Sequence, residues 1–205
     1  CSTNLLEFND LLTKLASQKI PTDLVFLDYA KAFDKVSHTL LLHKLSKYGL
    51  SDELIKWISS FLHNRRQRVV LGKPQSDWLP VLSGVPQGSV LGPVLFIMFI
   101  NDLSDHISNP ASLYADDTKL ASAILPNNTS KQICLQTDLN NIVNWTNTWH
   151  MELNVSKCKV MHIGKNNPGR NYFMTKSNSD QLIQLITTTS ERDLGIIISN
   201  DLKPT

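Results

Sequence analysis

Two adjacent carboxylates, Asp116 and Asp117, stand between two short strand-like runs, as at the tip of a β-hairpin. A third carboxylate, Asp28, ends the apolar run at residues 24–27, which is typical of a buried strand. Like charges held this close repel each other unless a divalent cation neutralises them. Oxygen ligands favour Mg²⁺, with Mn²⁺ as the alternative, and two such ions ~3.5–4 Å apart clamp an in-line phosphoryl displacement. The residues therefore predict two-metal nucleotidyl transfer, against the alternative of a solvated Asp-Asp turn.

Five segments resemble the blocks of one family, the reverse transcriptases, in chain order. Residues 27–34 (LDYAKAFD) resemble the first carboxylate block and residues 84–93 (GVPQGSVLGP) the second. Tyr114–Asp117 is similar to the third block, Leu153–Lys157 to the lysine-bearing fourth, and residues 193–197 (DLGII) to the strand pair that follows. The resemblance is strongest to jockey-like and related non-LTR retrotransposons, in which this polymerase is one part of a longer polyprotein.

The resemblance implies a role for each carboxylate and for one lysine. Asp28 would be the first metal ligand, and Asp116 would complete the two-metal site. Asp117 occupies a position nearer the primer end, where direct ligation is less consistent. Lys157 would protonate or neutralise the departing pyrophosphate. The alternative for Lys157 is a solvated charge beside Lys159.

The nucleotide site follows from the same resemblance. Phe33 would lie under the sugar of the incoming nucleotide, where a bulky ring leaves no room for a 2′-hydroxyl and so favours deoxynucleotides. Tyr29, Ala30 and Gln87 are also assigned to the nucleotide by the resemblance. The alternative for Phe33 is a core phenylalanine, which is the commoner situation of this residue type.

Template contacts are expected at two places. Pro86 and Gly88 combine a fixed φ with a close backbone approach, which suits a loop beside a template strand. Arg65, Arg66 and Arg68 form a local basic cluster, and arginines contact phosphates independently of sequence. The alternative for this cluster is a solvated hairpin edge protected by its charge.

Helical spacing of apolar residues predicts the elements around these sites. One helix should precede Pro21, a second should be capped by Ser37, a third should begin at Ser51, and a fourth should begin near Gly92. A long helix should cover about residues 130–149. The pattern predicts core positions in the third helix at Leu54, Ile55, Ile58, Phe61 and Leu62, and burial on most sides of residues 94–100.

The predicted fold class is α+β. The resemblance implies a right-handed polymerase palm, an antiparallel sheet backed by helices, with part of the fingers and no thumb, as one domain fragment over residues 1–205. Only about two dozen residues precede Asp28, so we expect the upstream fingers to be largely missing.

Composition is that of a globular protein, with 41% apolar and 19% charged residues. No apolar run approaches the ~20 residues needed to span a bilayer, so we expect no membrane contact and a cytoplasmic or nuclear protein. Three scattered cysteines, Cys1, Cys134 and Cys158, predict neither a disulfide framework nor a zinc site. The net charge of +2 is mild for a nucleic-acid protein.

Three functions remain open at this point. The first is an RNA-directed DNA polymerase core whose partners are an RNA template, a DNA primer, deoxynucleoside triphosphates and the rest of the parent polyprotein. The second is a domesticated or decayed copy that binds RNA without catalysis, which the intact Asp28, Asp116 and Asp117 disfavour. The third is an RNA-templated RNA polymerase, which Phe33 and the segment at residues 86–88 disfavour.

Overall fold

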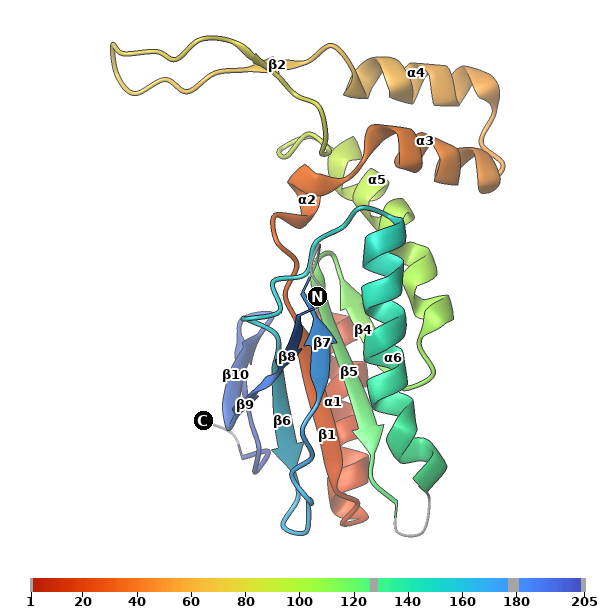
Figure 1. Cartoon of the computed structure of the whole chain (residues 1–205), viewed down its shortest axis with the longest axis vertical. Helices are drawn as coiled ribbons and strands as arrows, with labels where there is room; N and C mark the ends of the chain where they lie inside the picture. The colour runs from red at the N-terminus through yellow and green to blue at the C-terminus, as the bar shows by residue number, and fades with distance from the viewer. Residues whose placement is uncertain (1, 126–128, 177–180, 204–205) are drawn as a thin grey trace. The chain divides into compact units, whose positions relative to one another are not determined.

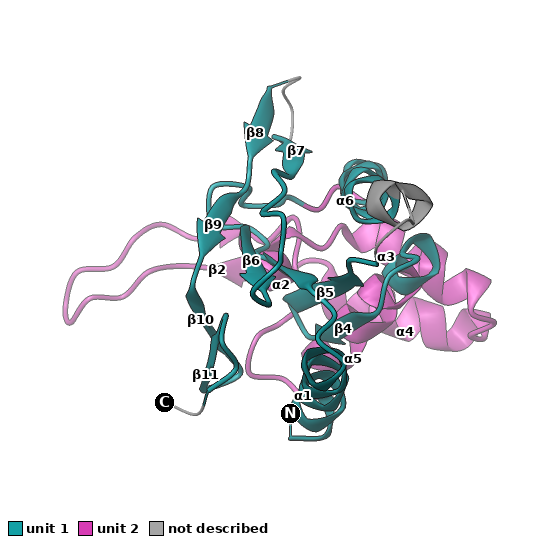
Figure 2. Cartoon of the chain, turned by 90° about the horizontal axis from the view of Figure 1, so that it is seen from below, with its two compact units in different colours: residues 1–30, 103–148, 152–205 teal, residues 31–102, 149–151 magenta. Residues whose placement is uncertain are grey.

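The computed structural model describes residues 2–125, 129–176 and 181–203, with side chains left out of the description at residues 129–133. The chain divides into two compact units (Figure 2). Unit 1 comprises residues 1–30, 103–148 and 152–205, and unit 2 comprises residues 31–102 and 149–151.

A five-stranded sheet forms the centre of unit 1, with the strand order β4-β5-β1-β6-β9 (Figure 1). Its pairs are antiparallel except for β6 and β9, which run parallel. The strands are β1 (Thr22–Leu27), β4 (Ala111–Tyr114), β5 (Asp117–Ala123), β6 (Lys159–Ile163) and β9 (Ile186–Thr188). The central strand β1 is buried along almost its whole length, as its apolar sequence predicts.

Helices cover the two faces of this sheet (Figure 2). On one face α1 (Ser2–Ser17) packs Phe8 and Leu12 against Leu24 of β1. On the other, α6 (Thr129–Thr148) buries Leu135, Leu139 and other apolar residues, and it packs against β5 and β7 (Phe173–Thr175). Unit 1 also contains the 3-10 helix η1 (Asn101–His106) from Leu103 onward, and the hairpins β7–β8 (Leu182–Gln184) and β10–β11 (Ser190–Asp193 and Ile196–Ser199).

Unit 2 is built from four helices and a short hairpin. They are α2 (Ala32–Lys35), α3 (His38–Lys47), α4 (Asp52–Leu62) and α5 (Leu91–Ile100), with β2 (Arg66–Gln67) and β3 (Leu79–Pro80). The side chains of Ser37 and Ser51 accept backbone hydrogen bonds at the starts of α3 and α4, so the predicted Ser37 cap and the predicted helix start at Ser51 are both confirmed.

A buried lysine contacts several separate segments of unit 2. The Lys44 ammonium on α3 donates to the Phe99 carbonyl at 2.6 Å and pairs with Asp102. It also lies 3.6 Å from the centroid of the Trp149 ring. Burial lowers the pKa of Lys44, and the neighbouring Asp102 partly opposes that shift. Segments far apart in the chain therefore meet at one cation.

Two predictions about helix faces were wrong. Leu54 of α4 is exposed, and among the predicted core positions of α4 only Ile58 and Leu62 are buried. Val94 and Ile97 of α5 are also exposed, so this helix is buried on one side rather than on most sides. Periodicity marks an apolar stripe, but tertiary packing decides how much of that stripe is covered.

The class prediction, an antiparallel-rich sheet with helices, is confirmed. Among the described residues, none of the helices is both long and apolar enough to cross a membrane.

Candidate active site

A two-residue hairpin turn carries the adjacent carboxylates. Tyr114 pairs with Asp117, and Ala115 and Asp116 form the loop between β4 and β5. Ala115 has a φ of 54°, whereas Asp116 is not among the described residues with positive φ. A positive φ at the first loop position alone is the pattern of a type II′ turn, whose twist matches that of paired strands. The predicted hairpin tip is therefore confirmed, with Asp116 in the turn and Asp117 as the first residue of β5.

The strand register brings Asp28 level with Asp117. Leu27 is the last residue of β1 paired to β5, and its partner is Thr118. One step further along both strands, Asp28 lies opposite Asp117. Residues directly opposite each other point to the same face of a sheet, so the two carboxylates share one face.

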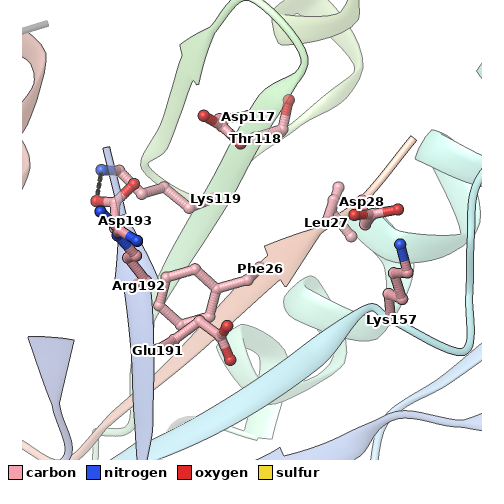
Figure 3. Close-up of a pocket in the computed structure, with 10 residues that line it drawn as sticks. All are labelled: Phe26, Leu27, Asp28, Asp117, Thr118, Lys119, Lys157, Glu191, Arg192 and Asp193. Atoms are coloured by element: carbon pink, nitrogen blue, oxygen red, sulfur yellow. Dashed lines mark hydrogen bonds and ion pairs between the residues drawn. The ribbon is translucent and has the colours of Figure 1, made fainter. Parts of the chain in front are cut away.

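The predicted lysine comes from the turn that precedes the other neighbouring strand, β6. Lys157 is the last residue of this turn, and Asn154 and Cys158 on either side of it contact the backbone of Asp28. Asp117, Asp28 and Lys157 all line a single pocket at this end of the sheet (Figure 3). Lys157 is drawn reaching toward the Asp28 carboxylate in that view.

Two lysines form a cross-strand row next to these three residues. Lys119 of β5 and Lys159 of β6 flank Phe26 of β1 on the same face. Lys119 pairs with Asp193 of β10, and the Lys159 Nζ lies 2.7 Å from an oxygen of Glu191. The pocket is therefore walled on one side by residues of β10, Glu191, Arg192 and Asp193.

Sequence reasoning missed this wall. The segment at residues 193–197 was expected to be a strand pair, and it is, but no site role was predicted for Glu191, Arg192, Asp193 or Lys119. The acidic residues Glu191 and Asp193, two apart in the sequence, were only a weak signal of a site, because acidic residues on a short strand are usually solvated. The pairing of Lys119 with Asp193 joins residues 74 apart in the chain.

The electrostatic environment of the hairpin is strongly anionic. Partial burial raises the pKa of the Asp117 carboxyl. The charges of Asp116, Asp193 and Asp28 raise the pKa of Asp117 further, and Lys119 acts in the opposite direction. A carboxylate disfavoured by its neighbours in this way is suited to binding a cation.

The donor set fits Mg²⁺ only together with a substrate. Among the described residues, no group of three acidic, histidine or cysteine side chains is close enough to hold a metal ion by itself. Mg²⁺ commonly takes one or two protein carboxylates and completes its shell with water and substrate phosphates. Asp28 and Asp117 in one pocket, with Asp116 in the adjoining turn, match that kind of site.

The backbone of Asp28 is held from both directions. Its carbonyl accepts a hydrogen bond from the Asn154 N–H at 2.8 Å, and its N–H donates to Cys158 Sγ at 3.4 Å. Burial raises the pKa of the Cys158 thiol to about 11, and the Asp28 charge also contributes. The thiol therefore stays neutral at physiological pH and supports Asp28 without competing as an anion.

Two of the residues assigned to the nucleotide have other contacts in this structure. Tyr29 is only 6% exposed and forms an isolated bridge with Leu153. The Ala30 N–H donates to the Glu152 carbonyl at 2.8 Å. Nucleotide contacts at Tyr29 and Ala30 stay predictions.

The remaining predicted residues lie in unit 2. The half-buried Phe33 ring stacks on Phe96, with ring centroids 4.3 Å apart. Gln87 Nε2 donates to the Asp34 carboxylate at 3.0 Å. Pro86 accepts a hydrogen bond at its carbonyl from Ser89 Oγ, which helps to shape the loop before α5.

The glycine that the packing of this loop requires is Gly92, for which no such role was predicted. Gly88 has a φ of +82°, which favours glycine, but a Cβ there would meet no atom within 4 Å. At Gly92 a Cβ would come within 2.3 Å of the Pro86 carbonyl oxygen. Close packing of the loop on α5 therefore depends on Gly92, and any template contact at Pro86 and Gly88 stays a prediction.

The three arginines of the basic cluster differ in their surroundings. Arg65 donates to the carbonyls of Leu62 and Gly84, at 2.9 and 2.8 Å. Arg66 is exposed on β2, and the Arg68 guanidinium lies 4.6 Å from the centroid of the Trp78 ring. Only Arg66 and Arg68 are thus exposed enough to offer a whole guanidinium to a phosphate.

Comparison with known proteins shows the family of the chain. Residues 2–198 match the family described as "Reverse transcriptase (RNA-dependent DNA polymerase)". The RNA-directed DNA polymerase from mobile element jockey of Drosophila melanogaster is 34% identical over 146 residues, which is 65% of this chain and 15% of that protein. A Pol polyprotein from the type-1 retrotransposable element R2 of Popillia japonica is 28% identical over 142 residues, covering 66% of this chain and 23% of that protein.

The fold is also that of a known polymerase. A structure of telomerase from Candida tropicalis, in complex with a TWJ fragment of telomeric RNA, superposes with a TM-score of 0.62 at 11% identity. The superposition covers 96% of this chain and 32% of the telomerase chain. The predicted palm-like fold is confirmed. The chain spans about 15% of the length of the jockey polymerase that it matches.

Proposed function

Because the chain belongs to the reverse transcriptase family, we propose that it is the polymerase core of a non-LTR retrotransposon protein. In this role it adds deoxynucleotides to the 3′ end of a DNA primer as directed by an RNA template. The observation that carries the proposal is that Asp117, Asp28 and Lys157 line one pocket at one end of the sheet, beside the Asp116 turn.

The reaction joins the primer 3′ oxygen to the α-phosphorus of the incoming nucleotide and breaks the bond to pyrophosphate. Two Mg²⁺ ions, if bound, would supply the positive charge that activates the attacking oxygen and stabilises the leaving oxygen. Asp28 and Asp116 would hold these ions, with Asp117 closer to the primer end. Burial raises the pKa of Asp117, and repulsion by Asp116, Asp193 and Asp28 raises it further. This repulsion supports the assignment because bound cations would relieve it.

Lys157 would act on the leaving group. Its ammonium enters the same pocket as the two carboxylates, so it can neutralise charge that develops on pyrophosphate or transfer a proton to it.

Unit 1 would correspond to the palm and unit 2 to part of the fingers. Unit 1 contains the sheet with the three carboxylates, and unit 2 contains the residues predicted to contact the nucleotide sugar and the template, Phe33, Gln87, Pro86 and the basic cluster. The stacking of Phe33 on Phe96 supports a fixed ring position, which a steric gate against the 2′-hydroxyl requires.

The test is Mg²⁺-dependent extension of a DNA primer on an RNA template. The chain is compared with Asp116→Ala, with a matched control, Asp105→Ala, which removes an exposed carboxylate on η1, and with a longer polypeptide that includes flanking regions of the parent. We expect Asp116→Ala to reduce the extension rate by on the order of 10²-fold or more, as does loss of one transition-state stabilising group. Asp105→Ala should match the wild type.

The outcomes separate the candidate functions. Extension that depends on Asp116 supports the polymerase, whether it is seen in this chain or in the longer polypeptide. Equal extension by Asp116→Ala and the wild type would overturn the metal assignment. RNA binding without extension by either polypeptide would favour a copy that has lost catalysis.

A further inference from the structure

The β10–β11 hairpin forms a wall of the pocket without being part of the main sheet. Its two strands, in the described structure, pair with each other as a separate two-stranded sheet. Both residues of its turn, Leu194 and Gly195, have positive φ, as in a type I′ hairpin. Only Thr189 separates β10 from β9 of the main sheet, so the chain itself tethers the start of the hairpin. Beyond that tether, side chains and not a ladder of backbone hydrogen bonds hold β10 beside the pocket.

Apolar packing holds one strand of the hairpin only in part. Ile198 of β11 is buried with Phe8 and Leu12 of α1, but Ile196 and Ile197 are exposed. Apolar contact is non-directional, so one buried isoleucine resists separation but sets neither the rotation nor the sliding of the hairpin.

Two ion pairs fix the orientation of the hairpin on the sheet. On β10, Glu191 and Asp193 are two apart and so project from the same side of the strand. On the sheet, Lys119 and Lys159 lie on either side of Phe26 in one cross-strand row. Each acid meets one lysine, so β10 runs along this row, across β1, and is held at two points.

The two ion pairs differ in burial. The side chains of Lys119 and Asp193 are each 5% exposed, whereas those of Lys159 and Glu191 are 35% and 22% exposed. Lys119 Nζ also lies 4.7 Å from the centroid of the Phe8 ring on α1, which adds a cation–π contact. A buried charge without its partner is strongly disfavoured, so the Lys119–Asp193 pair defines one position of the hairpin sharply.

We propose that Lys119 and Lys159 are positioning residues that hold the β10–β11 hairpin over the sheet, so that Glu191, Arg192 and Asp193 form a fixed wall beside the Asp28 and Asp117 carboxylates. The proposal rests on the proposed function for its consequence, which is the correct placement of primer and template at the pocket. The proposal also gives Asp193 a structural role: its carboxylate pairs with Lys119 and does not serve as a further metal ligand.

The first experiment measures hairpin position without catalysis. Amide hydrogen exchange of residues 190–199 is compared in the wild type, Lys159→Glu, Glu191→Lys and the charge-swapped double variant Lys159→Glu/Glu191→Lys. Each single variant places like charges together and should raise exchange in the hairpin about two- to fivefold, within the range for partly exposed pairs. The swap should restore exchange close to the wild-type rate. Lys165→Met, at an exposed lysine of the same unit, is the matched control.

The buried pair is tested with neutral side chains. Asp193→Asn leaves the Lys119 ammonium without its counter-ion and should raise hairpin exchange by roughly tenfold or more. The double variant Lys119→Met/Asp193→Leu should be less affected than Asp193→Asn, because no unpaired charge remains.

Activity gives the second readout. In a polypeptide that extends primers, Lys159→Glu should raise KM for primer–template several-fold with a smaller change in kcat, and the charge swap should recover KM. A loss of general stability would not be rescued in this way. If no polypeptide extends primers, the proposed function fails, and hydrogen exchange still decides the positioning role. Unchanged hairpin exchange in the single variants, or additive damage in the swap, would overturn the proposal.

Discussion

At the scale of single residues, Asp117 is the carboxylate of the candidate active site whose pKa its surroundings raise. Burial raises its pKa, and three carboxylates raise it further. The pKa of Asp117 is higher in the folded than in the unfolded state. This group is therefore most favourable to folding at a pH below its ordinary pKa, where it is protonated in both states. That contribution is lost as the pH rises through the folded-state value. At neutral pH the charged Asp117 therefore opposes folding of the metal-free protein.

Replacing Asp117 with Asn should consequently stabilise the metal-free protein. We expect Asp117→Asn to raise Tm by about 1 °C in EDTA at pH 7, a small effect because solvent screens this exposed group. Mg²⁺ should raise the wild-type Tm more than that of the variant. Thermal unfolding with and without Mg²⁺ measures both effects, with Asp105→Asn as the control. A lower Tm for the variant in EDTA would show that Asp117 is not under repulsion.

Phe33 offers a test of substrate choice at the same scale. Its ring is stacked on Phe96 and does not depend on the nucleotide for its position. In an extending polypeptide, Phe33→Val should raise the ratio of ribonucleotide to deoxynucleotide incorporation by about tenfold or more, because space for a 2′-hydroxyl is opened. Phe61→Val, at another half-buried aromatic of unit 2, should leave the ratio unchanged. No change in Phe33→Val would contradict the gate assignment.

At the scale of elements, the start of β1 is fixed by a buried carboxylate. Asp23 is fully buried and accepts hydrogen bonds from His162 Nδ1 at 2.7 Å, Asn167 Nδ2 at 2.9 Å and the Tyr172 hydroxyl at 2.5 Å. Burial raises the pKa of Tyr172, and its bond to Asp23 raises it further, so the phenol remains a donor. One side chain thereby attaches the connection between β6 and β7 to the central strand.

Removal of this carboxylate should loosen that connection. We expect Asp23→Ala to lower the free energy of unfolding by about 2–3 kcal/mol, since several buried donors lose their acceptor. This corresponds to a fall in Tm of roughly 5–10 °C. Chemical denaturation measures the change, and Asp10→Ala, at an exposed position of α1, should change it little. An equal effect at both positions would show that the network adds nothing.

At the scale of the whole molecule, charge is distributed unevenly although the net charge is only +2. The carboxylates of the candidate active site lie in unit 1, and the arginine cluster lies in unit 2. Attraction to nucleic acid must therefore come from local basic groups and not from a general positive field.

The arginine cluster allows binding and folding roles to be separated. Arg66→Ala should weaken RNA binding and reduce the slope of log K against log salt by about 1, as expected for one lost phosphate contact. Arg65→Ala should instead lower Tm with little change in slope, because Arg65 bonds two backbone carbonyls. Fluorescence anisotropy of labelled RNA over a salt series, together with thermal unfolding, tests both. A slope change confined to Arg65→Ala would reverse the assignment.

Local features of this protein were predictable because neighbouring residues determine them. Ser37 and Ser51 cap helices by bonding the residues that follow, and the Ala115–Asp116 turn is specified by its flanking strands. The helix over about residues 130–149 was also predicted within one residue at each end, because its apolar spacing is regular. Trp149, however, lies beyond the end of α6 and belongs to unit 2.

The amino-acid sequence by itself determined the family, the helices and the three carboxylates, since these depend on residue type and short-range spacing. Only the tertiary structure decided that Lys157 lines the same pocket as Asp28, that Cys158 supports the backbone of Asp28, and that Lys119 takes Asp193 as a partner. Each of these contacts joins segments far apart in the chain. Their partners are selected by strand register and by the high cost of an unpaired buried charge, and neither is visible in local sequence.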